Sequence, residues 1–298
     1  MGRRAKPLQQ QIDLLRRRGM IITDEAKVRD IILEIGWYRL SLYWFPFERR
    51  YPDMMADEHR FVENTRFEDA LMLYAFDFNL RNMLMRMLER VETAFRTFVI
   101  YHVSTRHPES PHWFADTNVV TRQHAANFEK AVYQPLRKLN QDIILHHRRF
   151  PRDRFAPAWK TLEFVTFGAM CQLYASLTSH NLRMEISRHF GIESPEVMDN
   201  YLEVLRALRN SCAHGNVMYA FHSPVEIRRQ PAAIAHGETH NLRGSLQVLH
   251  YLLRQISPRV AKELKNEVDA LLSRFDISHH VHKVLTGIAG FKNAHYNK

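Results

Sequence analysis

The sequence predicts an all-α fold, and three observations support that prediction. Apolar residues recur every three to four positions in several long stretches, which is the spacing of an amphipathic helix. Glycine is scarce, with 10 among 298 residues, and turn-rich stretches are few, which disfavours a β-sandwich or a β-barrel. Residues 65–106 contain neither proline nor glycine, so one long helix is expected there.

Local signals set the ends of the other expected helices. Asp24 is a favourable N-cap, and Gly36 is expected to end the helix that follows it. Ser194, followed by a proline and a glutamate, marks the start of a helix that should run to about residue 213. Helices are expected over 6–19, 24–36, 65–106, 121–147, 158–179, 181–190, 194–213, 242–256, 259–274 and 279–288. Loops are expected over 48–64, 107–118 and 221–232, the first of them as a loop or a small hairpin.

The chain is long enough for one large domain or two smaller ones. We expect an N-terminal helical and aromatic segment over 1–64, a helical core over 65–220 and additional C-terminal helices over 221–298. One compact domain containing all three segments is the alternative, and a join near 107–120 is a further candidate boundary.

The charge balance indicates a polyanionic partner. Lys and Arg total 42 against 32 acidic residues, a net charge of +10, and basic side chains release counterions when they bind phosphates. The alternative is a basic surface without such a partner. No cofactor is expected.

Cysteine content and hydropathy indicate where the protein works. Cys171 and Cys212 are the only cysteines, too few for a disulfide framework, which fits a reducing compartment. The first residues are basic but lack the apolar stretch of a secretion signal, and no run of about 18 apolar residues is present to span a membrane. We therefore expect a cytoplasmic protein without a membrane partner.

The segment 205–215, LRALRNSCAHG, carries the strongest chemical signal. Asn and Ser are weak helix formers, yet a polar Arg-Asn-Ser string interrupts an apolar face just before the helix is expected to end. Asn210 and His214 are four residues apart and share one helix face, with Arg206 one turn earlier. Arg209, Asn210 and His214 are therefore the candidate catalytic residues.

These residue types suit the cleavage of RNA without a metal. A base must remove the proton from the 2′-hydroxyl, a cation must stabilise the pentacovalent phosphorane, and an acid must protonate the leaving 5′-oxygen. Histidine can act as base or acid near neutral pH, arginine can bind two phosphate oxygens, and asparagine can orient the histidine or the phosphate. One helix supplies one such set, so two copies facing each other would complete the site.

The spacing alone also allows a simpler interpretation. His214 could cap the C-terminus of the helix, and Arg209 could be a surface cation favoured by the helix dipole. The histidines at 279, 280 and 282 could suggest a metal, but no HExxH or CxxC pattern accompanies them. No metal site is expected.

Four blocks of sequence resemble a known family when they are taken together. They are the aromatic block 36–47, the long-helix segment 89–102, the segment 159–168, and 208–214 with its Arg-Asn-x3-His motif. In this order, over roughly residues 8–220, they are similar to the Abi (abortive infection) proteins of the AbiD/AbiF-like group, which carry a HEPN nuclease domain. The chain departs from the family pattern after His214, where Gly215-Asn216-Val217 stands in place of a second histidine and charged residues.

The resemblance implies a HEPN-like helical bundle, metal-independent endoribonuclease activity, and a toxin or effector role in abortive-infection defence against phage. Arg209, Asn210 and His214 occupy the motif positions. The resemblance also implies a restraining partner, a small RNA or a protein antitoxin, and a homodimer if the second half of the site comes from another chain. A non-catalytic RNA-binding module or regulator of the same fold is the alternative.

A second candidate half-site lies on the long helix, at Glu92, Arg96 and His102. Glu92 and Arg96 are one turn apart and can form an ion pair that orients the arginine, and the Arg-x5-His spacing fits the loose family pattern. The alternative is a buried ion pair that fixes helix packing, with His102 merely near a helix end.

Two further sets of residues could contact RNA. Basic side chains could follow the phosphate backbone, or they could simply be solvated; they are Arg148, Arg149, Arg152, Arg154 and Arg206. An aromatic stripe could stack on unpaired bases or belong to the core; it consists of Trp37, Tyr38, Tyr43, Trp44 and Phe45.

Overall fold

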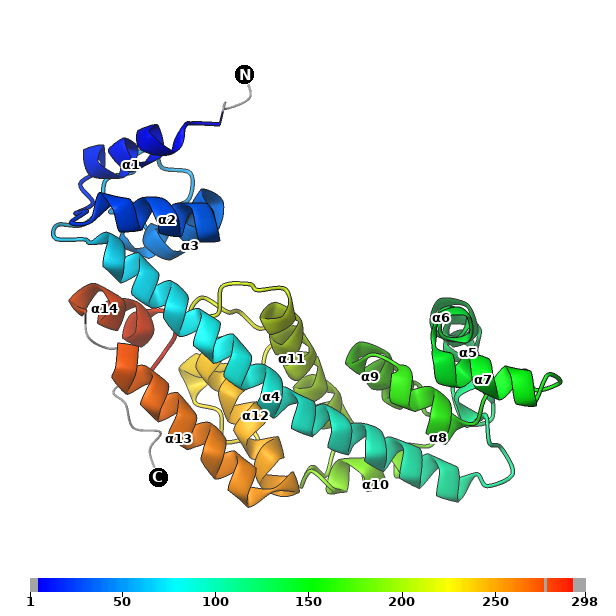
Figure 1. Cartoon of the computed structure of the whole chain (residues 1–298). Helices are drawn as coiled ribbons and strands as arrows, with labels where there is room; N and C mark the ends of the chain where they lie inside the picture. Colours follow the sequence, from blue (N-terminus) through cyan, green and yellow to red (C-terminus); the bar gives the residue numbers. More distant parts are fainter. Residues whose placement is uncertain (1–4, 276–277, 292–298) are drawn as a thin grey trace. The chain divides into compact units, whose positions relative to one another are not determined.

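The computed structural model describes residues 5–275 and 278–291. Within these residues the chain is helical, and extended backbone pairs only at isolated bridges (Figure 1). The expected all-α fold is confirmed. Every described helix is too short or too polar to span a lipid bilayer.

The α-helices run in chain order from α1 to α14. They are α1 (Leu8–Arg17), α2 (Glu25–Ile35), α3 (Trp37–Trp44), α4 (Phe67–Arg106), α5 (Arg122–Phe128), α6 (Gln134–Leu139), α7 (Gln141–Arg149), α8 (Ala158–Thr161), α9 (Phe167–Ser176), α10 (His180–Arg188), α11 (Pro195–Ala213), α12 (Leu242–Ile256), α13 (Pro258–Phe275) and α14 (His279–Gly287). Short helical turns are η1 (Phe45–Phe47), η2 (Trp113–Ala115), the π-helical η3 (Glu129–Tyr133), η4 (Leu162–Phe164) and η5 (His236–Glu238). The single long helix expected over 65–106 is confirmed as α4.

Two predicted helices are wrong as single elements. The helix expected over 121–147 is interrupted at Asn140, whose backbone is extended and whose side chain accepts hydrogen bonds from the N–H groups of Asp142 and Ile143. The helix expected over 158–179 is interrupted at Val165 and Thr166, and the Thr166 side chain accepts from the Ala169 N–H. Both capping side chains offer the backbone an alternative to a continuous helix.

The chain forms two compact units. Unit 1 draws its residues from Met1–Met83, Ser211–Phe221 and Lys265–Lys298, and unit 2 from Leu84–Asn210 and His222–Leu264. The expected segments 1–64, 65–220 and 221–298 stay a prediction, because packed units do not establish which parts of the chain fold independently.

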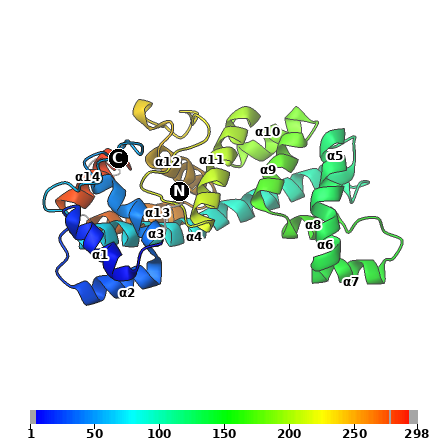
Figure 2. The same cartoon turned by 90° about the horizontal axis from the view of Figure 1, so that it is seen from above.

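Unit 1 is built around the first half of α4. Helices α1, α2 and α3 lie together in both views (Figures 1 and 2), and consecutive members of this group pack on each other. Phe76 of α4 meets Phe275 and Phe291 in edge-on ring contacts at 6.1 and 6.3 Å. The segment 48–64 forms one antiparallel bridge, between Glu48 and Phe61.

Unit 2 packs around the second half of α4. The fully buried Phe95 contacts the rings of Phe167 on α9, Tyr174 on α9 and Phe190 after α10, at centroid distances of 5.6 to 6.3 Å. Helices α5, α6 and α7 follow one another closely and lie together in both views (Figures 1 and 2). These aromatic contacts bury the face of α4 that carries Phe95.

Candidate functional site

Helix α11 begins and ends at well-defined caps. Ser194 Oγ accepts a hydrogen bond from the Val197 N–H at 3.3 Å, as the N-cap expected from the sequence. At the other end, the N–H of Gly215 donates to Cys212 O and the N–H of Asn216 donates to Ser211 O. This pair of bonds is a Schellman motif, which places Gly215 in the left-handed region, at φ +68°. His214 is therefore the C-cap residue of α11.

The three motif residues differ in exposure. Arg209 and Asn210, on the last turns of α11, are half-buried, whereas His214 is exposed. Arg209 Nε is buried and has no hydrogen-bond partner within the part of the chain that the structure describes. An orphaned buried donor costs about 1–3 kcal/mol, so this position of the guanidinium is held at some cost in stability. Arg209 and Asn210 belong to unit 2 and His214 to unit 1.

The turn after His214 is held by charged side chains of unit 1. Arg39 on α3 donates to Gly215 O at 3.0 Å, and Arg81 on α4 donates to Asn216 O at 3.1 Å. Asp77, one helical turn before Arg81, accepts from the N–H groups of Met218 and Tyr219 at 2.6 and 3.0 Å; its side chain is completely buried. These side chains hold in place the backbone of the turn next to the exposed His214 imidazole.

Burial dominates the electrostatics around this turn. It raises the pKa of Asp77 to about 7, while the Met218 N–H and the Arg81 guanidinium oppose that rise. Burial likewise raises the pKa of the Cys212 thiol to about 12 and that of Tyr219 further still. Cys212 is therefore a neutral packing residue of the turn and no thiolate nucleophile.

The sequence alone does not predict Arg39, Asp77 or Arg81 as site residues. Asp77 and Arg81 gave the one usable signal, because they are oppositely charged residues four apart in an otherwise uncharged part of the long helix. Their partners in the turn after His214 lie more than 130 residues away in the chain, and no local pattern predicts such contacts.

Glu92 and Arg96 of the second candidate set form an ion pair, and Arg96 also packs α4 against η4. The Arg96 Nη2 lies 2.9 Å from Glu92 Oε1, and its Nη1 donates to the carbonyl oxygens of Leu162 and Glu163 in η4. The Arg96 side chain is only 10% exposed. An arginine that ties α4 to η4 in this way matches the packing interpretation of the pair.

His102 lies apart from that ion pair. Its Nε2 is 2.6 Å from the Nε2 of His189, and its Nδ1 is 3.9 Å from Glu185. Burial lowers the pKa of His102, and the neighbouring imidazole of His189 lowers it further. The three residues Glu92, Arg96 and His102 therefore make two separate sets of contacts.

The basic residues predicted to bind RNA divide into an exposed group and a paired one. Arg148, Arg149, Arg152 and Arg154 are exposed around the C-terminal end of α7. Arg154 nevertheless pairs with Glu129 at 2.6 Å, and Arg206 pairs with Glu203 at 2.5 Å. Within the described residues, Arg148, Arg149 and Arg152 are the exposed members of this group that make no ion pair.

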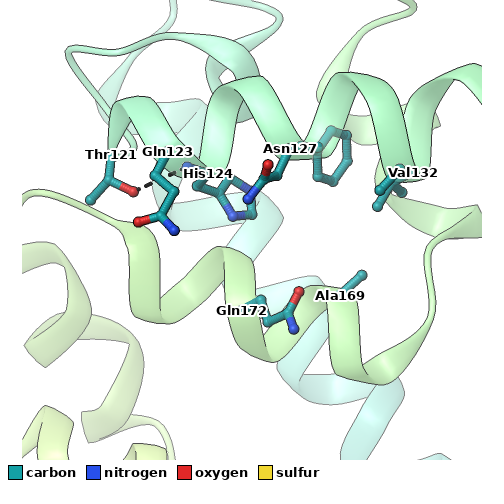
Figure 3. Close-up of a pocket in the computed structure, with 9 residues that line it drawn as sticks. Thr121, Gln123, His124, Asn127, Val132, Ala169 and Gln172 are labelled. Carbon is teal, nitrogen blue, oxygen red and sulfur yellow. Dashed lines mark hydrogen bonds between the residues drawn. The ribbon is translucent and has the colours of Figure 1, made fainter.

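A separate pocket of about 280 Å³ lies between α5 and α9 in unit 2 (Figure 3). Its lining carries no charged side chain among the described residues; the labelled polar members are Thr121, Gln123, His124, Asn127 and Gln172. His124 Nε2 is buried there without a hydrogen-bond partner in the described structure. None of the residues predicted to be catalytic or to bind RNA lines this pocket.

His124 gives a testable dependence of stability on pH. Burial lowers its pKa from 6.5 to about 4, so between these values the unfolded chain binds more protons at this position than the folded chain. The free energy of unfolding should therefore fall as pH is lowered from about 6.5 to about 4. Urea unfolding at several pH values measures this dependence. For His124→Asn, the free energy of unfolding should fall less between pH 6.5 and 4 than it does for the unmodified chain, whereas His236→Asn, at an exposed position, should match the unmodified chain. An equal dependence on pH in all three proteins would refute a neutral buried His124.

The described residues contain no group of three or more His, Cys, Asp or Glu side chains arranged to hold a metal ion. The histidines at 279, 280 and 282 lie at the start of α14, and His280 contacts the ring of Phe47 at 5.9 Å.

Comparison with known proteins places this site within a matched region. A family model described as Abi-like protein matches residues 30–220 of the chain. The match includes α3, α4, α11 and the turn that carries His214. No curated protein and no solved structure matches the chain.

Proposed function

Because the chain belongs to the Abi-like protein family, we propose that it is a metal-independent HEPN endoribonuclease of the AbiD/AbiF-like group. It acts as a toxin or effector in abortive-infection defence against phage. Arg209, Asn210 and His214 carry the cleavage.

The single observation that best supports this proposal is the setting of His214. Its imidazole is exposed, yet the backbone on both sides is fixed, by the Schellman motif at the helix end and by Arg39, Arg81 and Asp77 at the turn. A general acid or base needs both access to the substrate and a held position.

The reaction assigns one role to each residue. The imidazole of His214 takes the proton from the 2′-hydroxyl or delivers one to the leaving oxygen. The 2′-oxygen attacks phosphorus and the bond from phosphorus to the 5′-oxygen breaks, which leaves a 2′,3′-cyclic phosphate and a 5′-hydroxyl. Arg209 binds the phosphate oxygens of the phosphorane with its charged guanidinium. Asn210 orients the imidazole or the phosphate.

One cleavage assay tests the proposal. The purified full chain, treated with EDTA, is incubated with total RNA, and the ends of the products are mapped. We expect fragments with 2′,3′-cyclic phosphate and 5′-hydroxyl ends. Cleavage that requires added divalent metal, or that leaves a 5′-phosphate, would contradict the proposed chemistry.

The net charge of +10 favours a second candidate, a non-catalytic RNA-binding module or regulator. It would bind RNA with a strong dependence on salt and leave the RNA intact.

We propose a small RNA or a protein antitoxin as the restraining partner of the nuclease, and a homodimer as the source of the second half-site. The molar mass of the active species in solution tests the homodimer.

A further inference from the structure

A groove of about 610 Å³ opens on unit 1 beside α3. We call it the α3 groove and define it by six of its lining residues: Lys6, Arg18, Trp37, Tyr38, Phe45 and Arg50. They come from the segment before α1, from the end of α1, from α3, from η1 and from the loop after η1, so the groove is a product of the folded unit.

The structure divides the aromatic stripe of α3 into two halves with different surroundings. Tyr43 and Trp44 are buried, at 0% and 1% exposure, and belong to the core. Tyr38 is 80% exposed, and Trp37 is partly exposed and is braced by Trp44, whose ring meets it edge-on at 4.9 Å. Trp37 and Tyr38 thus present aromatic surface to solvent from a rigid helix.

The charges around the groove favour an anionic ligand. Its described lining contains three basic residues, Lys6, Arg18 and Arg50, against one acidic residue, Glu48. Arg50 is paired with the buried Glu48 at 2.6 Å, so the two charges offset each other. Arg50 also donates to backbone carbonyls of the following loop, which fixes this side of the groove. Lys6, also in the lining, adds positive charge beside this pair.

Helix α3 also connects the groove to the turn that carries His214, and this connection lies entirely within unit 1. Arg39, next to Tyr38 in the sequence, is the residue that donates to Gly215 O. One short helix therefore bears aromatic surface for the groove and a clamp on the candidate catalytic turn. A ligand that reaches the turn can use the same helix for recognition.

We propose that the α3 groove binds unpaired bases of single-stranded RNA, with Tyr38 and Trp37 as stacking surfaces and Lys6 beside the phosphate backbone. Aromatic surfaces next to basic side chains bind single-stranded nucleic acid with little sequence preference, because every base offers a flat face. The proposal rests on the proposed function for its substrate class. It adds the site that selects single strands over duplexes.

The test measures binding separately from cleavage. In the full-length His214→Ala background, Tyr38→Ala should weaken the binding of a fluorescent single-stranded oligoribonucleotide by about 5- to 150-fold, the range expected from loss of one base–aromatic stack. Tyr38→Phe, which keeps the ring, should bind within about twofold of its parent. A duplex of the same sequence should bind equally well to all three proteins, since its bases are already stacked.

The outcomes separate this proposal from the nuclease proposal. If Tyr38→Ala binds the single strand as tightly as its parent does, the groove is not an RNA site, whether or not the chain cleaves RNA. If the otherwise unmodified chain binds single strands through Tyr38 but never cuts them, the groove stands and the nuclease proposal fails. The melting temperature of Tyr38→Ala should match that of its parent, because this side chain lies mostly in solvent. If the melting temperature is lowered and duplex binding is weakened as well, the loss of binding comes from disturbed folding, and the assignment of the groove is wrong.

Discussion

Replacing His214 with alanine is expected to lower the rate of RNA cleavage by about 10²- to 10⁴-fold, the usual contribution of a general acid or base. The imidazole is exposed, so the replacement removes the proton-transfer group while leaving the core intact. Binding of RNA should change little, because the turn is held by Arg39, Arg81 and Asp77 and not by the imidazole. Single-turnover cleavage of a labelled oligoribonucleotide, with parallel binding curves, measures both effects.

A matched control tests whether a contaminating ribonuclease causes the observed cleavage. His236 is also exposed but lies in η5 of unit 2, so His236→Ala, purified in the same way, should cleave at the rate of the unmodified chain. If His214→Ala retains full activity, His214 takes no part in the chemistry. If both histidine variants lose activity equally, the observed cleavage does not report on the candidate site.

Replacing Asp77 with asparagine is expected to reduce the free energy of unfolding and RNA cleavage together. The carboxylate accepts two backbone N–H groups, from Met218 and Tyr219. An amide has a single acceptor oxygen and turns its NH₂ group towards the second N–H. One buried donor left without an acceptor costs about 1–3 kcal/mol, and the turn that carries His214 loses part of its support.

Urea unfolding, read at equal denaturant slopes, measures the loss of stability, and single-turnover cleavage measures the loss of activity. The control is Asp57→Asn, which makes the same chemical change at an exposed position of unit 1. It should leave both quantities unchanged. An Asp77→Asn protein as stable as its parent would mean that the carboxylate does not hold the turn.

Local sequence signals predicted most helix ends because the responsible side chains are neighbours in the chain. The Ser194 cap of α11 and the glycine after α2 work over three or four residues, so the pattern alone predicts them. The breaks at Asn140 and Thr166 were missed because asparagine and threonine also occur within helices. Only their capping hydrogen bonds distinguish the two cases.

The candidate site was predicted in part, for a related reason. Arg209, Asn210 and His214 form a short pattern, which sequence comparison with a family can reveal. The supports of the turn could not be found in this way, since Asp77 and Met218 are 141 residues apart and meet only after α4 and the chain beyond α11 have packed. The division of the aromatic stripe had the same cause, because the rest of unit 1 decides which rings of α3 are buried.

The close approach of Arg39 to Gly215 has a consequence for how this position can vary in evolution. A Cβ atom at residue 215 would lie 3.2 Å from Arg39 Nη1, and the backbone there has a positive φ. The crowding would disappear with a shorter side chain at position 39, but the backbone strain would persist with any L-amino acid. A lineage that replaces the glycine would therefore have to move the Arg39 guanidinium by a few tenths of an ångström and tolerate a strained helix end, so asparagine is the replacement expected most often here.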